Sequence, residues 1–201
     1  MKTMILDVAG VLVDFPWKNR FLELGIPKED VDFLAEATLK SDAWAHFDAG
    51  TWEDEKVLSE MKKNAPGKEE FVQRIWDKVS EAVATRPYAK EWIRHLKKCG
   101  YGVYILSNYP GKIYEECKDR LTFETEADGV IWSYRVKLAK PDKKIYELLL
   151  NRFQLEAKEC VFIDDTPINL VEPKKLGITT IHFETFHQVQ EELEKLGVPK
   201  M

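Results

Sequence analysis

The chain has 201 residues, of which 44% are hydrophobic and 32% are charged, and its formal net charge is −5. This composition is ordinary for a globular protein with a real core, and so acidic a chain lacks the basic face that nucleic-acid binding requires. We also expect a cytoplasmic protein with no membrane partner, because no apolar run approaches a membrane span and the amino terminus lacks a signal-peptide pattern.

The first predicted element is a buried strand that delivers Asp7 to its carboxyl end. Ala9, Gly10 and a second apolar run follow, and the glycine lets the backbone turn sharply beside the aspartate. A single Asp-x-x-Gly is more often a loop carboxylate after an edge strand. Its meaning therefore depends on the later parts of the chain.

Residues 16–85 carry no strand signal and are predicted to form successive amphipathic helices. A short helix that contains Trp44 and His46 is expected to stop at Gly50. The next helix is expected to begin at Thr51, because Thr51 to Asp54 has the spacing of a capping box. This part of the chain is thus predicted to be all-helical.

The pattern changes after residue 86, where helices alternate with buried apolar runs. Strands are expected at residues 101–106, 160–163 and 178–183, and helices are expected before and after them. Such alternation is the repeating unit of a parallel sheet. Pro173 should kink the helix predicted for residues 167–177.

These elements predict an α/β fold with a Rossmann-like parallel sheet and an inserted all-helical cap. Residues 1–15 and 86–201 would form the sheet-containing core domain, and residues 16–85 would form the cap domain. An insertion after the first strand should lie over the carboxyl edge of the sheet, where open α/β sheets bind their ligands.

Polar residues end three of the predicted strands, and in a parallel sheet their tips share one edge. They are Asp7, the pair Ser107-Asn108 and the pair Asp164-Asp165. Carboxylates a few ångströms apart repel one another unless a cation lies between them, and an all-oxygen set without His or Cys points to Mg²⁺. Lys140 can bring a further positive charge to this edge. A hydroxyl, a lysine, a metal and a free aspartate together suit a phosphoryl group.

Four motifs span the whole chain, in the order Asp7-x-x-Gly10, Ser107-Asn108, Lys140-Pro141, and Asp164-Asp165 followed by Asn169. Together they resemble the haloacid dehalogenase-like (HAD) hydrolase superfamily, in its branch with a helical cap after the first strand. The resemblance implies that Asp7 is the nucleophile and forms an aspartyl-phosphate. It also implies that Ser107, Asn108 and Lys140 bind the phosphoryl group. The implied Mg²⁺ ligands are Asp7, the backbone carbonyl of Ala9, Asp164 and Asp165, with Asn169 supporting the metal site.

Ala9 departs from the pattern of the family's phosphatases, which usually carry a second aspartate at this position. That aspartate protonates the leaving oxygen and then deprotonates the attacking water, which is worth about 10²–10⁴ in rate. Some capped members, including sugar-phosphate phosphatases, also lack it. Water or a cap residue could substitute, and His46 is the candidate that we name, with Trp44 as a substrate wall. The plainer interpretation of His46 is a histidine packed at a helix end.

We expect a Mg²⁺-dependent phosphatase that acts on a small phosphorylated metabolite such as a sugar phosphate, as a monomer or homodimer. One alternative is a binding or regulatory protein that keeps the fold without turnover. Another is a metal-independent 2-haloacid dehalogenase, but that branch lacks the paired acids at Asp164 and Asp165. A mutase ranks last, because it depends on the missing aspartate more than a phosphatase does.

Overall fold

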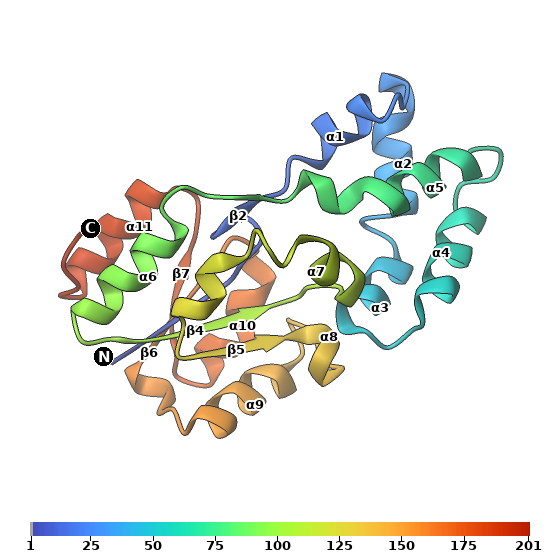
Figure 1. Cartoon of the computed structure of the whole chain (residues 1–201). Helices are drawn as coiled ribbons and strands as arrows, with labels where there is room; N and C mark the ends of the chain where they lie inside the picture. The colour runs from blue at the N-terminus through green and yellow to red at the C-terminus, as the bar shows by residue number, and fades with distance from the viewer. Residues whose placement is uncertain (1) are drawn as a thin grey trace.

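The computed structural model describes residues 2–201 and is built on a five-stranded parallel sheet with the strand order β5-β4-β1-β6-β7 (Figure 1). The first strand, β1 (Thr3–Leu6), is central and pairs with β4 on one side and β6 on the other. The predicted α/β fold with a parallel sheet is confirmed. Because β1 is central, the residue that follows it emerges at the middle of the carboxyl edge.

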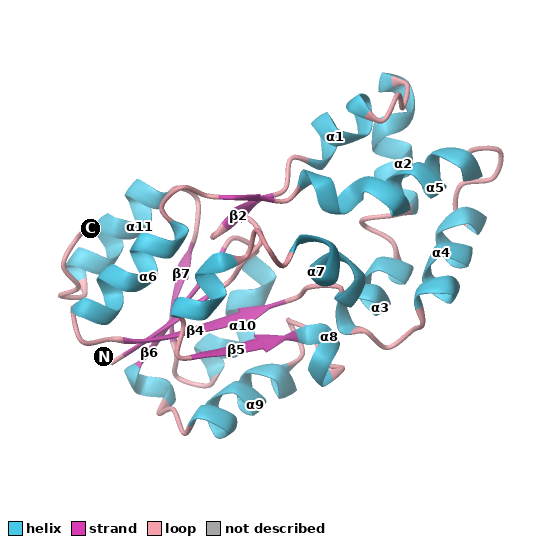
Figure 2. Ribbon diagram, viewed as in Figure 1, coloured by secondary structure: helices cyan, strands magenta, loops and turns pink. Residues whose placement is uncertain are grey.

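The remaining elements are helices and short strands, with five consecutive α-helices between β2 and β3 (Figure 2). The other strands are β2 (Val13–Asp14), β3 (Ala84–Thr85), β4 (Gly102–Ser107), β5 (Gly129–Trp132), β6 (Cys160–Asp164) and β7 (Thr179–His182). The helices are α1 (Trp17–Glu23), α2 (Val31–Ala37), α3 (Asp42–Ala49), α4 (Asp54–Lys63), α5 (Glu69–Lys78), α6 (Ala89–Lys98), α7 (Gly111–Cys117), α8 (Ser133–Val136), α9 (Lys143–Phe153), α10 (Val171–Lys175) and α11 (Phe186–Lys195). None of the helices in residues 2–201 is long and apolar enough to cross a membrane.

Helices cover both faces of the sheet, so alternate residues of β1 enter different apolar clusters. Met4 and Leu6 belong to the cluster that contains Trp92 of α6 and also includes residues of α11. Ile5 belongs to the cluster on the other face, which contains Leu149 of α9. All four residues of β1 are buried, as expected for a central strand of a parallel sheet.

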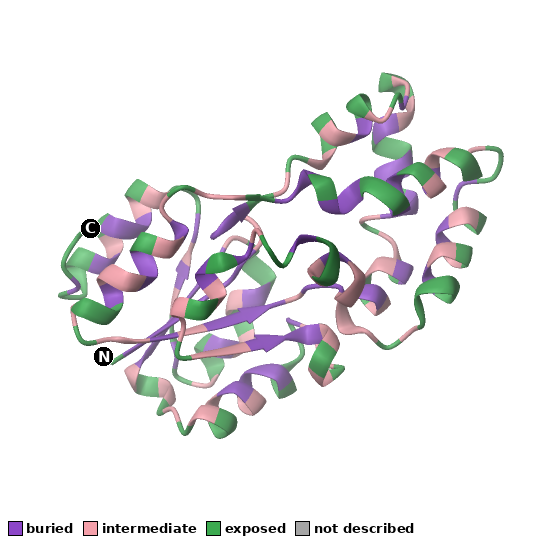
Figure 3. Cartoon of the chain, in the orientation of Figure 1, coloured by how far each residue is buried: buried purple, intermediate pink, exposed green. Residues whose placement is uncertain are grey.

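The helices α1–α5 lie to one side of the sheet, beyond its carboxyl edge (Figure 1). The chain leaves the sheet-containing part at β2 and returns to it at β3, and these two short strands pair antiparallel. Helices α3, α4 and α5 bury apolar faces among themselves, including Phe47, Val57 and Ile75, and expose their outer faces (Figure 3). The segment therefore has an apolar interior, which is continuous with the cluster that contains Met4 and Leu6.

The structure differs from three local expectations. The capping box at Thr51 does not form, because α4 begins only at Asp54, while the Thr51 hydroxyl lies 2.7 Å from His46 Nδ1. Pro173 produces no kink, since a 3₁₀ turn at Pro167–Leu170 precedes α10 and leaves Pro173 in the first helical turn. The edge strand β5 was not anticipated, because only half of its four residues are buried.

The buried face of the sheet yields a stability prediction. Ile105 of β4 is fully buried, so Ile105→Ala should lower the free energy of unfolding by about 2–5 kcal/mol through lost burial and a residual cavity. Ile168 is 57% exposed, and Ile168→Ala should change it by less than about 0.5 kcal/mol. Urea denaturation measures both values, and similar values for the two variants would contradict this placement of β4.

Candidate active site

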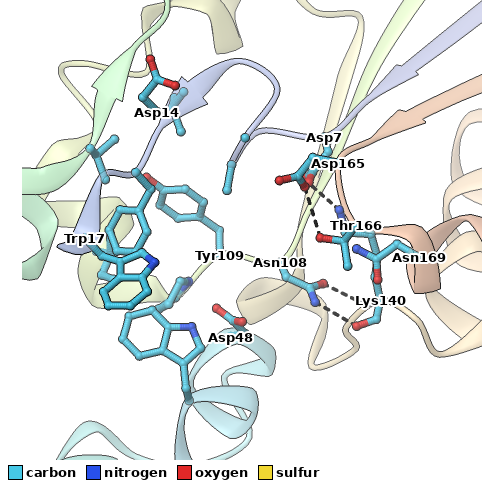
Figure 4. Close-up of a pocket in the computed structure, with 18 of the residues that line it drawn as sticks. Asp7, Asp14, Trp17, Asp48, Asn108, Tyr109, Lys140, Asp165, Thr166 and Asn169 are labelled. Carbon is cyan, nitrogen blue, oxygen red and sulfur yellow. Dashed lines mark hydrogen bonds and ion pairs between the residues drawn. The ribbon is translucent and has the colours of Figure 1, made fainter. Parts of the chain in front are cut away.

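Three charged side chains from distant parts of the chain meet at the carboxyl edge of the sheet, and Figure 4 shows two of them, Asp7 and Lys140. Asp7 directly follows β1, Asp164 is the last residue of β6, and Lys140 lies in the loop before α9. The Lys140 ammonium group is 2.8 Å from Asp7 Oδ1 and 2.6 Å from Asp164 Oδ2. All three residues are buried, so the ion pairs are shielded from solvent and strongly coupled.

Asp164 is held by neighbours on both of its carboxylate oxygens. The Thr166 backbone N–H donates to Oδ1 over 2.8 Å, and Asn169 Nδ2 lies 3.1 and 3.2 Å from the two oxygens. Lys140 supplies a further bond to Oδ2. With its lone pairs engaged in this way, Asp164 is suited to fixing Lys140 and the β6 tip in place.

Asp165 lies directly against Gly10 in the loop after β1. Gly10 has a φ of +77°, and a Cβ at this position would collide with the Asp165 carboxylate. The glycine therefore provides both a left-handed turn and the space that this carboxylate occupies. The Thr166 hydroxyl lies 3.2 Å from Asp165 Oδ1.

The acidic residues fit an oxygen-liganded divalent cation. Asp7, Asp164 and Asp165 each offer a carboxylate oxygen, and these atoms lie within 4.8 Å of one another. Asp7 Oδ1 is buried without a hydrogen bond of good geometry, although it forms the ion pair with Lys140. Three carboxylates against one lysine leave an excess of negative charge, which a hard cation such as Mg²⁺ would balance.

Burial and mutual repulsion shift the titration of these groups. Burial raises the pKa of Asp7, and Asp164 and Asp165 add to the rise, whereas Lys140 opposes it. Burial also raises the pKa of Asp165, with a further contribution from Asp164. For Lys140, burial acts to lower the pKa, but attraction to Asp7 and Asp164 outweighs it, so the pKa of Lys140 is raised and the ammonium form persists.

The two residues at the β4 tip have different surroundings. The Asn108 side chain faces the cavity and makes two hydrogen bonds with the backbone of Lys140, over 2.8 and 2.9 Å. Asn108 thus holds the backbone of Lys140 in place, and its predicted contact with a phosphoryl group remains a prediction. Ser107 is fully buried, and its hydroxyl lies 3.4 Å from the Asn108 carbonyl oxygen. The predicted contact of Ser107 with a phosphoryl group remains a prediction.

A cavity of about 940 Å³ lies between the sheet edge and the helical segment. Asp7, Ala9, Asn108, Lys140 and Asp165 line its inner side. Side chains of the helical segment, of β2 and β3 and of the loop after β4 form much of its outer side. They include Val13, Asp14, Phe15, Pro16, Trp17, Trp44, Asp48, Val83, Arg86, Tyr109, Pro110 and Ile113.

The structure brings Trp44 to this cavity but does not bring His46 there. The His46 ring stacks on Trp52 at 3.9 Å between centroids, and His46 is not among the residues that line the cavity. The reason is helical geometry, because residues four apart share a face of a helix whereas residues two apart do not. Trp44 and Asp48 therefore face the cavity together. Asp48 was missed, although its spacing from Trp44 was visible in the sequence.

Helix α3 is attached to the sheet-containing part by contacts with α8 and its flanking residues. The Ser133 hydroxyl donates to the Asp48 carbonyl oxygen and accepts a hydrogen bond from the Tyr109 N–H over 2.8 Å. The Lys137 ammonium group donates to the Gly50 carbonyl oxygen. At Gly50 a Cβ would lie 2.8 Å from the Tyr134 carbonyl oxygen, so this close approach requires glycine.

Comparison with protein families and curated proteins identifies relatives across most of the chain. A family model described as haloacid dehalogenase-like hydrolase matches residues 1–171. Sesquiterpene phosphatase astK of Aspergillus oryzae is 24% identical over 90% of this chain and 89% of its own length. A phosphorylated carbohydrates phosphatase of Thermotoga maritima is 26% identical over 90% and 84%. (S)-2-haloacid dehalogenase 4A of Burkholderia cepacia is 27% identical over 90% and 82%.

Solved structures share the fold. A HAD family enzyme of Bacteroides thetaiotaomicron, solved in complex with magnesium and inorganic phosphate, superposes with a TM-score of 0.71 at 19% sequence identity. The superposition covers 94% of this chain and 98% of that chain. This likeness extends over both the sheet and the helical segment.

The buried ion pairs yield a second stability prediction. Lys140→Met leaves Asp7 and Asp164 buried without their cation, so the free energy of unfolding at pH 8 should fall by about 3–5 kcal/mol. Lys143→Met, which removes an exposed pair with Glu147, should cost less than about 1 kcal/mol.

The loss in free energy of unfolding caused by Lys140→Met should become smaller as the pH falls. Lys140 opposes the rise in the folded-state pKa of Asp7, so its removal raises that pKa further above the unfolded value, and the folded variant gains protons, and stability relative to wild type, as the pH is lowered through it. Urea unfolding at pH 8 and pH 5 measures the change. A deficit that grows toward pH 5 would contradict the assigned ion pairs.

Proposed function

The chain belongs to the haloacid dehalogenase-like hydrolase family, and from this premise we propose that it is a Mg²⁺-dependent phosphatase acting through an aspartyl-phosphate. The proposal is carried by one observation. Asp7 lies at the centre of the sheet edge, faces the cavity, and is within 2.8 Å of a buried lysine beside two further carboxylates.

Each residue of the site would have a distinct task in phosphoryl transfer. Asp7 would attack the phosphorus atom in line with the departing alcohol oxygen. Lys140 would neutralise negative charge on Asp7 and on the phosphoryl oxygens, and Asp164 would hold Lys140 in position. Mg²⁺, held by Asp7, Asp165 and the Ala9 carbonyl with Asp164 beside them, would supply further charge neutralisation.

The acidic cluster favours this function over metal-independent dehalogenation. A dehalogenase needs one nucleophilic aspartate, and additional buried carboxylates beside it would repel its negative charge. Here Gly10 leaves the space in which the Asp165 carboxylate reaches the site. A cation site explains why the Asp165 carboxylate lies beside Asp7, whereas halide displacement would not use that carboxylate.

The helical segment would act as the cap of the enzyme. We propose the division into a core of residues 1–15 and 86–201 and a cap of residues 16–85, with the paired strands β2 and β3 as the connection. The cavity lies between the two parts, so closure would exclude water from the aspartyl-phosphate and select the substrate.

The outer side of the cavity favours an apolar leaving group over a sugar. We define the apolar wall as Val13, Phe15, Pro16, Trp17, Trp44, Val83, Tyr109, Pro110 and Ile113. The charged groups beside it are Asp48 and the ion pair of Asp14 with Arg86, whose atoms lie 2.9 Å apart. Sugar hydroxyls require many polar partners, whereas this wall offers apolar and aromatic surface. Among the relatives, the sesquiterpene phosphatase agrees with this preference and the phosphorylated carbohydrates phosphatase does not, so the preference rests on the residues of the wall.

Catalysis should require both the nucleophile and the metal. Wild-type protein should hydrolyse para-nitrophenyl phosphate in Mg²⁺, and Asp7→Asn should reduce turnover to background because an amide cannot form the acyl phosphate. EDTA should abolish turnover, and added Mg²⁺ should restore it. Equal rates for wild type and Asp7→Asn would instead support a binding or regulatory protein, and halide release from a 2-haloacid in EDTA would support a dehalogenase.

The apolar wall should determine the choice of substrate. We expect kcat/KM for naphthyl or farnesyl phosphate to exceed that for hexose or pentitol phosphates by at least about 10-fold, since burying one ring or prenyl unit is worth about 1.5–3 kcal/mol. Trp44→Ala should raise KM for the apolar esters by about 10-fold. Trp52→Ala is the matched control, because Trp52 stacks on His46 and is not among the residues that line the cavity. A preference for sugar phosphates would contradict this assignment.

A further inference from the structure

The proposed reaction needs a proton carrier that the sheet edge does not supply. When Asp7 attacks, the alcohol oxygen leaves with developing negative charge, and an alkoxide leaves poorly unless it is protonated. Ala9 lines the cavity but has no titratable group. Lys140 is engaged by Asp7 and Asp164, and a raised pKa keeps its proton in place.

The wall of the cavity opposite the sheet edge carries a carboxyl group that forms no ion pair with any described residue. The charged residues that line the cavity are Asp7, Asp14, Asp48, Arg86, Lys140 and Asp165. Asp14 is paired with Arg86, and Asp7, Lys140 and Asp165 belong to the sheet-edge cluster. Among these described lining residues, Asp48 alone has neither an ion pair nor a place in that cluster.

We propose that Asp48 of helix α3 is the general acid and base of the phosphatase, in place of the side chain that Ala9 lacks. The proposal rests on the proposed function. In the first step the Asp7 oxygen bonds to phosphorus, the phosphorus–alcohol bond breaks, and the alcohol oxygen takes the proton of Asp48. In the second step the Asp48 carboxylate takes a proton from water, whose oxygen attacks phosphorus and releases inorganic phosphate and the Asp7 carboxylate.

The direction of in-line transfer supports this assignment. Asp7 attacks from the sheet edge, so the alcohol must depart on the opposite side, toward the helical segment. Figure 4 shows the Asp48 carboxyl group projecting from its helix into the space that faces Asp7 and Lys140. Trp44 lies one turn earlier on the same face, so one helix would hold the leaving group and protonate it.

The surroundings of Asp48 suit proton transfer near neutral pH. Burial raises the pKa of Asp48 to about 7, with Lys140 lowering it, Asp7 raising it, and the Trp44 indole lowering it. A carboxyl group with this pKa exists in both protonation states at pH 7, as a group that alternates between acid and base requires. The other charged groups that line the cavity are Asp165, Asp14 and Arg86.

The backbone of Asp48 is fixed by the sheet-containing part. The Ser133 hydroxyl joins the Asp48 carbonyl oxygen to the Tyr109 N–H, directly after the β4 tip. Gly50, at the end of α3, has no side chain and so allows the backbone to lie close to Tyr134. Asp48 is thus positioned relative to the sheet edge, although it belongs to a different part of the fold, as proton transfer demands.

The test compares esters with good and poor leaving groups. Asp48→Asn should lower kcat/KM for an alkyl phosphate by at least about 10²-fold and for para-nitrophenyl phosphate by less than about 10-fold, because nitrophenolate leaves without a proton. The parameter kcat/KM covers only the steps up to departure of the alcohol, so it isolates the acid role. Asp42→Asn, an exposed acid on the same helix, should leave both values unchanged.

A second variant separates proton transfer from a structural effect. Ala9→Asp places a carboxyl group on the cavity wall and should restore alkyl phosphate hydrolysis in the Asp48→Asn background. In wild type, kcat/KM for the alkyl ester should fall as the pH rises through about 7, and this fall should be absent in Asp48→Asn. For the aryl ester, kcat/KM should change little over the same pH range.

The possible outcomes distinguish the two proposals. Equal losses on both esters, or no loss, would overturn the role of Asp48 while leaving an Asp7-dependent phosphatase intact. A uniform rise in KM would show that Asp48 only binds substrate, and would also overturn the proposal. Absence of any Asp7-dependent turnover in wild type would overturn the phosphatase itself, and the role of Asp48 with it.

Discussion

The site depends on one buried ammonium group held between two carboxylates. Lys140 lies 2.8 Å from Asp7 and 2.6 Å from Asp164, and the three residues come from three separate parts of the chain. Removing such charges from water is costly, so the arrangement persists only while all three partners are present. The contact therefore ties the loop before α9 to the tips of β1 and β6 and fixes the point where phosphoryl chemistry is proposed.

The carboxylates around this lysine are not equivalent. Asp164 is surrounded by hydrogen-bond donors and acts as an anchor, whereas Asp165 reaches the site through the space left by Gly10. Asp7 has a buried oxygen whose partner is the Lys140 ammonium group, and it lines the cavity together with Asp165. Asp48 is a fourth carboxyl group on the opposite wall. Acid–base and nucleophilic roles are thereby assigned to different sides of one cavity.

Elements with a strong local pattern in the sequence were predicted, and elements with a weak pattern were not. The strands that end at Asp7, Ser107 and Asp164 are nearly continuous apolar runs, and all three were anticipated. The edge strand β5 was not, because its first two residues are only half-buried and it lacks such a run. His46 was chosen for its chemistry, although the four-residue spacing from Trp44 indicated Asp48.

The sequence by itself determined the parallel sheet, the helical insertion and the convergence of Asp7, Lys140 and the paired aspartates, because strand order and apolar runs bring polar tips to one edge. Only the tertiary structure decided which face of α3 meets that edge. The rotation of a helix about its axis depends on contacts with distant segments, here Ser133 and the close approach at Gly50. Those contacts hold Asp48 on the wall of the cavity opposite the sheet edge.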